Sequence, residues 1–171
     1  NDIQNIKTLI VGGAPVTEKL KKEIKDIPTN VYETYGMTET ITHIAVKRLN
    51  HTTRKTVNIF KTLPDVSVSL DDRGCLVVHA PHVSEEEVVT NDIVKLHSET
   101  EFEWLGRIDN VINSGGIKIF PEQIESKLHP FIDRRYIIAS LPDADLTEKV
   151  VLLVEGEKMK LDKSVFSSLE K

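Results

Sequence analysis

The densest group of residues that could bind a ligand is YETYGMTET, residues 32–40. The ring of Tyr35 can stack on a base, the hydroxyl of Thr38 can donate to a phosphate oxygen, and the carboxylate of Glu39 can bind Mg²⁺. The same residues also suit a polar turn at the end of a strand, where hydroxyl groups cap the backbone. Spacing favours the two interpretations equally, so a nucleotide and Mg²⁺ site here is a hypothesis.

Two further segments carry candidate ligand-binding residues. In VGGAPVTEKL, residues 11–20, the turn of Gly12 and Gly13 can point backbone N–H groups at a nucleotide. It is not a Walker loop, because Lys19 is followed by Leu20 rather than by Ser or Thr. In Thr90-Asn91-Asp92, the carboxylate of Asp92 can accept hydrogen bonds from both hydroxyls of a ribose. An ordinary turn explains either segment more often than a ligand does.

A fourth stretch is GRIDNVINSGGIKIFPEQIE, residues 106–125. A charged cluster that ends at Asp109 runs directly into a hairpin around Gly115 and Gly116, whose glycines permit positive φ. Pro121 then suits the first turn of a helix. The pattern raises the question of why a charged tetrapeptide precedes a small hairpin.

Other function classes are disfavoured. His79 and His82 stand three apart across Pro81 in strand-like sequence, so side-chain alternation does not aim them and Cys75 at one metal ion. The formal charge of −5 favours no nucleic-acid partner, and no apolar run is long enough for a membrane span. The single cysteine excludes an internal disulfide framework and is consistent with a reducing, cytoplasmic compartment.

Three regions must position these residues. A strand at 8–11, a helix at 17–27 and a strand at 30–36 predict a βαβ unit at the edge of a larger parallel sheet. From residue 43 to 104, short alternating runs predict a small antiparallel sheet or barrel. After residue 109, the hairpin, the helix that Pro121 opens, strands at 136–141 and 149–156 and a helix beginning near 162 predict a compact α+β domain. The expected fold class is α/β plus α+β.

The sequence starts next to a strand and stops within a helical pattern, so we expect a fragment or a domain of a longer protein.

The motifs GGAP, YGMTET, T-x-D and GRIDNVINSGGIKIFPEQIE occur in an order that resembles the adenylate-forming superfamily of acyl-CoA synthetases, adenylation domains and luciferases. The resemblance covers nearly the whole chain. It implies three parts: residues 1–42 at the edge of a large N-terminal domain, a small β subdomain at 43–108, and a C-terminal lid at 109–171. Within the superfamily, TETITHIAVKRLN and VINSGGIKIFPEQIE are most similar to the o-succinylbenzoate–CoA ligases of menaquinone biosynthesis.

The resemblance also implies roles for single residues. Thr38 and Glu39 match the catalytic threonine and the Mg²⁺ carboxylate, and Tyr35 matches the ring that packs on adenine. Asp92 matches the ribose-binding aspartate, although Asn91 stands where the superfamily usually has glycine. The full set of nucleotide-binding matches is Gly12, Gly13, Ala14, Pro15, Tyr35, Thr38, Asp92 and Arg107.

The second half of the chain matches the parts that move. Asp109 matches the hinge at which the lid rotates, and Gly115 and Gly116 match the glycines beside the CoA pantetheine chain. The expected substrates are therefore ATP (with AMP as a product), CoA and a small carboxylic acid, with Mg²⁺ as the cofactor. Full-length members often associate, so a homo-oligomer fits the resemblance.

Two elements of the superfamily have no match. The Ser/Thr/Gly-rich phosphate loop lies upstream in the superfamily, and none of Lys158, Lys160, Lys163 and Lys171 follows a glycine as the catalytic lysine does. We therefore expect the 171-residue chain alone to be inactive. The alternatives are a ligase for another acid or an adenylation enzyme, and a non-catalytic module on the same scaffold.

Overall fold

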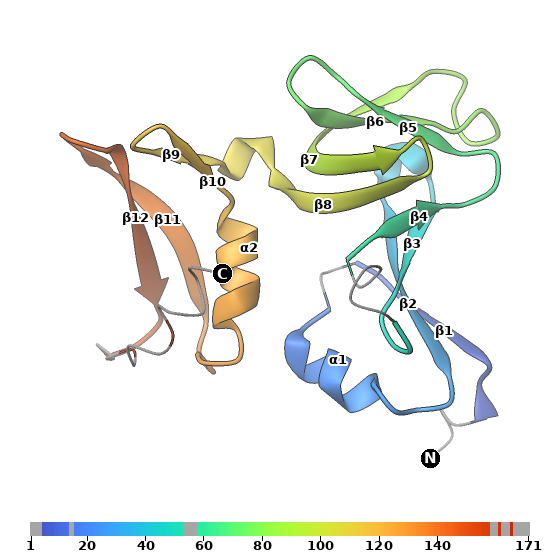
Figure 1. The fold of residues 1–171 in the computed structure, drawn as a ribbon, viewed down its shortest axis with the longest axis horizontal. Coiled ribbons are helices and arrows are strands. Elements are labelled where there is room, and N and C mark those ends of the chain that lie inside the picture. Colours follow the sequence, from blue (N-terminus) through green and yellow to red (C-terminus); the bar gives the residue numbers. More distant parts are fainter. Residues whose placement is uncertain (1–4, 14–15, 53–57, 158–160, 162–164, 166–171) are drawn as a thin grey trace. The chain divides into compact units, whose positions relative to one another are not determined.

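The computed structural model describes residues 5–13, 16–52, 58–157, 161 and 165. The chain divides into two compact units, Asn1–Trp104 and Leu105–Lys171 (Figure 1). Each unit is described by itself. The three-part division into 1–42, 43–108 and 109–171 stays a prediction.

The first unit begins with the expected βαβ arrangement. Strand β1 (Thr8–Val11) pairs in parallel with β2 (Asn30–Gly36), and helix α1 (Glu18–Ile24) connects them. Thr17 caps the helix, because its hydroxyl accepts a hydrogen bond from the Leu20 backbone N–H at 3.2 Å. A small core of Val16, Ile24, Val31 and Leu49 lies between helix and strands.

The parallel pair continues directly into antiparallel strands. Those strands are β3 (His43–Arg48), β4 (Phe60–Thr62), β5 (Ser67–Leu70), β6 (Cys75–His79), β7 (Val88–Ser98) and β8 (Glu101–Arg107). Within the described part of residues 8–107, the strand order is β1-β2-β3-β4-β8-β7-β6-β5. The antiparallel strands were predicted, except for the three-residue β4. One sheet thus links the βαβ unit to the β-rich region.

The main core of the first unit lies under the antiparallel strands. It holds Ile44, Ala45, Phe60, Val66, Val68, Leu76, Val78, Ala80, Val94 and Phe102. A buried amide ties the smaller core to β2. Asn50 is 2% exposed; its Oδ1 accepts from the Val31 N–H at 3.0 Å and its Nδ2 donates to the Ile24 carbonyl at 3.1 Å. The start of β2 is therefore held firmly.

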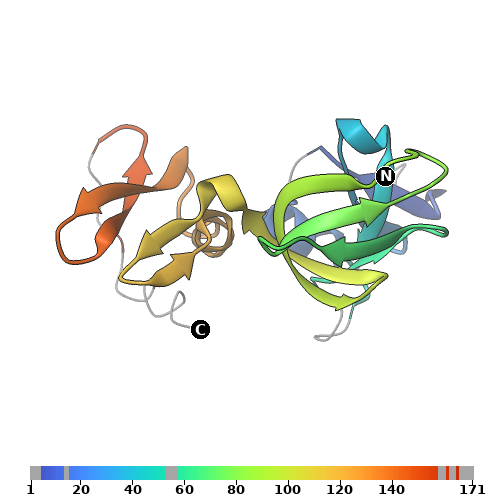
Figure 2. The same cartoon turned by 90° about the horizontal axis from the view of Figure 1, so that it is seen from above.

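The second unit is the expected α+β domain. It contains β9 (Ile112–Ser114), β10 (Ile117–Ile119), α2 (Pro121–Leu128), β11 (Tyr136–Asp143) and β12 (Thr147–Val154). Its described strands pair in the order β10-β9-β12-β11. Figure 2 looks almost along the axis of α2, which contacts β11. The helix expected near 162 falls, apart from Val165, outside the described residues.

One carboxylate and one phenol join α2 to the sheet of the second unit. Glu125 Oε1 accepts from the Ile138 N–H at 2.8 Å, and the Tyr136 hydroxyl donates to the Glu125 carbonyl at 2.7 Å. The hydrophobic core of this unit contains Ile112, Leu128, Ile132, Ile138 and Val165. None of the described helices of either unit is long and apolar enough to cross a membrane.

Candidate active site

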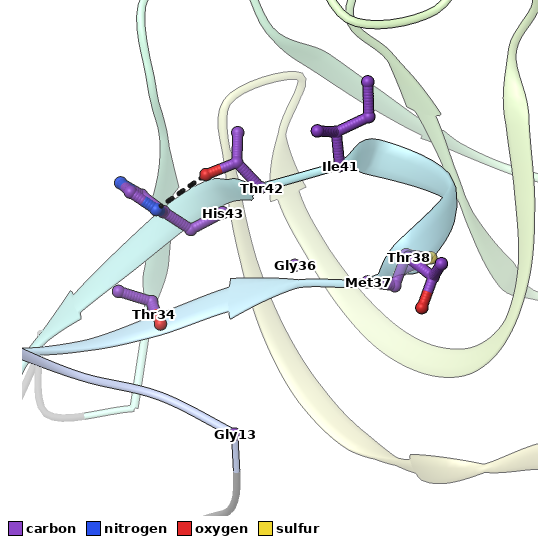
Figure 3. A pocket seen from close by; sticks show the side chains of 8 residues that line it. All are labelled: Gly13, Thr34, Gly36, Met37, Thr38, Ile41, Thr42 and His43. Carbon is purple, nitrogen blue, oxygen red and sulfur yellow. Dashed lines mark hydrogen bonds between the residues drawn. The ribbon is translucent and has the colours of Figure 1, made fainter.

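A pocket of about 580 Å³ opens beside the end of β2. Two predicted site residues, Gly13 and Thr38, line it together with the strand residues Thr34 and Gly36. In Figure 3, Ile41 and Thr42 lie on the connection that returns to β3, and the Ile41 side chain points away from β2. The remaining lining residues are Met37 and His43. Ala14 and Pro15 lie outside the described residues.

Gly36 is required where the chain turns back. A Cβ at this position would lie 2.5 Å from the Thr42 carbonyl oxygen and 2.7 Å from the His43 Cα. Both are backbone atoms, which cannot swing aside as a flexible side chain would. The close approach brings the two arms of the β2–β3 connection together at the pocket.

Thr40 organises the turn that carries Thr38 and Glu39. This 3₁₀ turn, η2, spans Thr38–Thr40. The buried Thr40 Oγ1 accepts from the Met37 N–H at 3.1 Å and lies 2.8 Å from the Thr42 carbonyl oxygen, to which it can donate. Thr38 and Glu39 are exposed as a result. A hydroxyl and a carboxylate are thus presented side by side on a fixed turn.

Ile41, next in the chain, has an unusual backbone conformation. Its φ and ψ are 62° and −42°, and the Thr42 N–H donates to the Thr40 carbonyl at 2.5 Å. Such a three-residue γ-turn is rare, and strained for a β-branched residue. The Ile41 side chain is 80% exposed. The turn holds an apolar side chain in the open at the pocket wall.

The structure brings Tyr35 and Asp92 together across 57 residues of sequence. The Tyr35 hydroxyl donates to Asp92 Oδ2 at 2.5 Å. The Tyr35 ring packs edge-on against Phe102, with centroids 5.3 Å apart, and is tilted against Phe60 at 5.7 Å. A ring fixed by two aromatic neighbours therefore sets the position of the carboxylate.

Arg73, which the sequence did not point out, braces the part of β7 that leads to Asp92. Arg73 Nη1 donates to Asn91 Oδ1 at 3.0 Å, and its Nη2 donates to the Thr90 carbonyl at 2.9 Å. Arg73 Nε also pairs with Asp71 at 2.8 Å. The N–H of Cys75 and the Arg73 side chain hold the pKa of the Asp71 carboxyl below its usual range. Asn91 thus has a structural role where the superfamily has glycine.

The predicted hinge and hairpin lie in the second unit. Arg107 Nη2 is 3.5 Å from Asp109 Oδ2, and both side chains are more than half exposed. Asp109 lies in a 3₁₀ turn, η3 (Ile108–Asn110). Gly115 and Gly116 have φ of 59° and 81°, as expected for the turn of this hairpin. Such an exposed ion pair contributes little to stability.

In the part of the chain that the structure describes, no group of three or more His, Cys, Asp or Glu side chains could hold a metal ion. Glu39 offers one exposed carboxylate beside Thr38. This fits Mg²⁺, which commonly takes one or two protein carboxylates together with phosphate oxygens.

Comparison with known proteins decides the family. Residues 1–86 match the family described as AMP-binding enzyme. The chain belongs to this family. The 2-succinylbenzoate–CoA ligase of Lactococcus lactis is 25% identical over 168 residues, which cover 89% of this chain and 37% of that protein. The 3,4-dihydroxybenzoate–[aryl-carrier protein] ligase of Bacillus anthracis is 26% identical, covering 70% of this chain and 28% of that protein.

Solved structures of the family agree in fold. An acyl-CoA synthetase (AMP-forming)/AMP-acid ligase II-like protein from Dyadobacter fermentans is 36% identical, with a TM-score of 0.57, covering 95% of this chain and 46% of that one. The o-succinylbenzoate coenzyme A synthetase of Bacillus subtilis, solved with ATP and a magnesium ion, is 21% identical with a TM-score of 0.74, covering 95% and 39%. The chain spans less than half the length of these relatives.

Proposed function

We propose that this chain forms part of the adenylating site, and the lid, of an ATP-dependent acid–CoA ligase whose acid is o-succinylbenzoate. The observation that carries the proposal is the Tyr35–Asp92 hydrogen bond, formed from the same strand whose Thr34 and Gly36 line the pocket. It joins the ring that would stack on adenine to the carboxylate that would bind the ribose, two groups that a polar turn alone would not require. Family membership and the curated relative from L. lactis support the reaction and the acid.

The predicted nucleotide-binding residues would have separate roles. Tyr35 would pack against adenine, Asp92 would accept the ribose hydroxyls, and Arg107 would lie near the ribose. Gly12, Gly13, Ala14 and Pro15 would line the adenine and acyl pockets. Thr38 would donate to a phosphate oxygen, and Glu39 would bind Mg²⁺, which neutralises phosphate charge when bound.

The reaction proceeds in two steps. An oxygen of the acid's carboxylate attacks the α-phosphorus of ATP, the bond to pyrophosphate breaks, and an acyl-adenylate forms. The CoA sulfur then attacks the acyl carbon, its proton is lost, and AMP leaves. Between the steps Asp109 would rotate, and the hairpin at Gly115 and Gly116 would admit the pantetheine chain. Positioning and charge stabilisation supply the rate.

A second candidate is an enzyme that loads an aryl acid onto a carrier protein. It is favoured by the B. anthracis relative, which matches this chain at similar identity. We also propose that the full-length enzyme is cytoplasmic and forms a homo-oligomer. A non-catalytic module on this scaffold would be indicated by a degenerate phosphate loop upstream.

The test measures acid-dependent ATP–pyrophosphate exchange in a protein that carries this chain together with the remaining length of its relatives. We expect o-succinylbenzoate to support exchange at least about tenfold better than 3,4-dihydroxybenzoate, fatty acids or amino acids. A preference for the aryl acid, with transfer to a carrier domain, would establish the second candidate instead. We expect the 171-residue chain alone to give no exchange.

Tyr35→Phe provides the matched variant within that assay. It keeps the ring packing but removes the hydroxyl bond to Asp92, so we expect a KM for ATP about tenfold higher. Tyr32→Phe is the control, because Tyr32 lies in the same strand but its side chain is on the opposite face. Equal effects of the two variants would argue against a ribose role for Asp92.

A further inference from the structure

Glu122 lies against a glycine at the start of the predicted hinge. Gly106 is buried, with φ of 154°, and a Cβ there would lie 2.6 Å from Glu122 Oε2 and 3.4 Å from Phe120 Cδ1. The Glu122 carboxylate therefore occupies the space that a side chain at residue 106 would fill. Only glycine allows this contact.

The other oxygen of the same carboxylate holds the far end of the hinge segment. Asn110 Nδ2 donates to Glu122 Oε1 at 2.6 Å. One side chain thus contacts residues 106 and 110, on either side of Asp109. Glu122 itself is in the first turn of α2, where a negative charge is stabilised by the free backbone N–H groups.

The contact is incomplete in one respect. Glu122 Oε2 is buried and has no hydrogen-bond partner among the described residues. A buried acceptor without a donor costs about 1–3 kcal/mol, so burying this oxygen destabilises the arrangement. A contact that is formed but not fully satisfied can be released at low cost, as a two-state element requires.

We propose that Glu122 is a positioning residue for the hinge: its carboxylate latches residues 106–110 to the first turn of α2. The latch holds the η3 turn closed. It limits backbone rotation at Asp109 until the Glu122 contacts with residues 106 and 110 break. This inference rests on the proposed function for the role of Asp109, but the latch itself requires neither nucleotide nor acid.

The test is amide hydrogen exchange on the 171-residue chain. The reporter is the Val111 N–H, which donates to the Ile108 carbonyl at 3.3 Å and closes the η3 turn. We expect Glu122→Ala to speed exchange at Val111 about tenfold, while amides of the β11–β12 ladder exchange as in the wild type. Glu122→Gln, which keeps an acceptor for Asn110, should restore exchange to within about twofold of the wild type. Gln123→Ala, an exposed neighbour in the same helix, is the control.

Two results would overturn the latch. Exchange at Val111 that is equal in Glu122→Ala and Gln123→Ala would show that the carboxylate does not hold the turn. Faster exchange throughout β11 and β12 would show that Glu122 merely stabilises the whole unit. Neither result tests adenylate formation. Conversely, an absence of ATP–pyrophosphate exchange with o-succinylbenzoate would contradict the proposed function but not the latch.

Discussion

Single residues at the pocket are constrained by the backbone as much as by their side chains. Gly36 has no room for a Cβ, and Ile41 holds a γ-turn that few β-branched residues adopt. The Thr40 hydroxyl forms hydrogen bonds within the turn, whereas Thr38 and Glu39 are exposed. The strained backbone of Ile41 therefore lies at the pocket wall and not in the core.

We predict that Ile41→Gly does not lower stability. Relief of about 1–3 kcal/mol of backbone strain should offset the roughly 0.5–1 kcal/mol that glycine costs through the unfolded chain. The control is Ile137→Gly, which removes an exposed side chain from within β11 and should cost about 1 kcal/mol. Urea unfolding midpoints give the comparison. Each variant is compared with the wild type in the transition of its own unit, and a larger loss for Ile41→Gly than for Ile137→Gly would contradict the strain.

At the scale of elements, β2 and β3 are joined by a nearly buried ion pair. Glu33 Oε2 is 3.0 Å from Lys47 Nζ, with side chains 10% and 12% exposed, and Lys47 also lies 4.4 Å from the Phe60 ring centre. Lys61 and Glu101 form a comparable pair between β4 and β8, but the Lys61 side chain is 63% exposed. The two cross-strand pairs differ mainly in solvent access.

We therefore predict that Glu33→Ala destabilises the first unit by about 3 kcal/mol, since it leaves the Lys47 charge buried without its partner. Glu101→Ala should cost less than about 1 kcal/mol. The double variant Glu33→Leu, Lys47→Met should recover most of the loss, because apolar residues of similar volume can replace a buried pair. Chemical denaturation measures all three, and equal losses at Glu33 and Glu101 would contradict the role of burial.

In the second unit, the Glu148 side chain of β12 joins neighbouring strands through hydrogen bonds. Its Oε1 accepts from the Ser140 hydroxyl and its Oε2 from the Asn113 N–H, each at 2.7 Å. In the described residues, β9 and β12 pair at Ser114 and Thr147, so this carboxylate supports a short junction. The Ser140 hydroxyl and then the Asn113 N–H lower the pKa of Glu148 below its usual 4.5.

A lowered pKa fixes the direction of the pH dependence. The stabilisation by Glu148 is fully present above pH 4.5, the usual pKa, and is lost as the pH falls through the lower value of the folded state. We predict that the wild type loses more stability than Glu148→Gln between pH 6 and about 3.5. Glu155→Gln, an exposed glutamate that follows β12, is the control. A Glu148→Gln variant as acid-sensitive as the wild type would contradict this assignment.

At the scale of the whole molecule, each compact unit has its own hydrophobic cores. Those of the first unit are built around Ile44 and Val31, and that of the second around Ile112. Units with separate cores are expected to unfold as separate cooperative steps. The chain should therefore show two transitions.

We predict that Glu33→Ala shifts only one of these transitions and Glu148→Gln only the other. Calorimetry combined with exchange at amides of β2 and β11 assigns each transition to its unit. A single transition that both variants shift by the same amount would contradict independent unfolding.

Patterns of local sequence predicted most of the elements, because glycine, proline and alternating residues act over a few positions. The βαβ start, the hairpin at Gly115 and the helix at Pro121 all depend on such local signals. The three-residue β4 is too short to show a period. The meeting of Tyr35 with Asp92 and the bracing of Asn91 by Arg73 depend on strand register, which no local pattern encodes.

Strand β2 shows how this register bears on protein engineering. Glu33 and Tyr35 face the cores, whereas Thr34 and Gly36 line the pocket, and Gly36 accepts no side chain. In a directed-evolution library, diversity at Thr34 would reshape the pocket and leave the cores intact. Diversity at Glu33 or Tyr35 would mostly lower the stability of the first unit. For reshaping this pocket, alternate positions along one strand are therefore not equivalent targets.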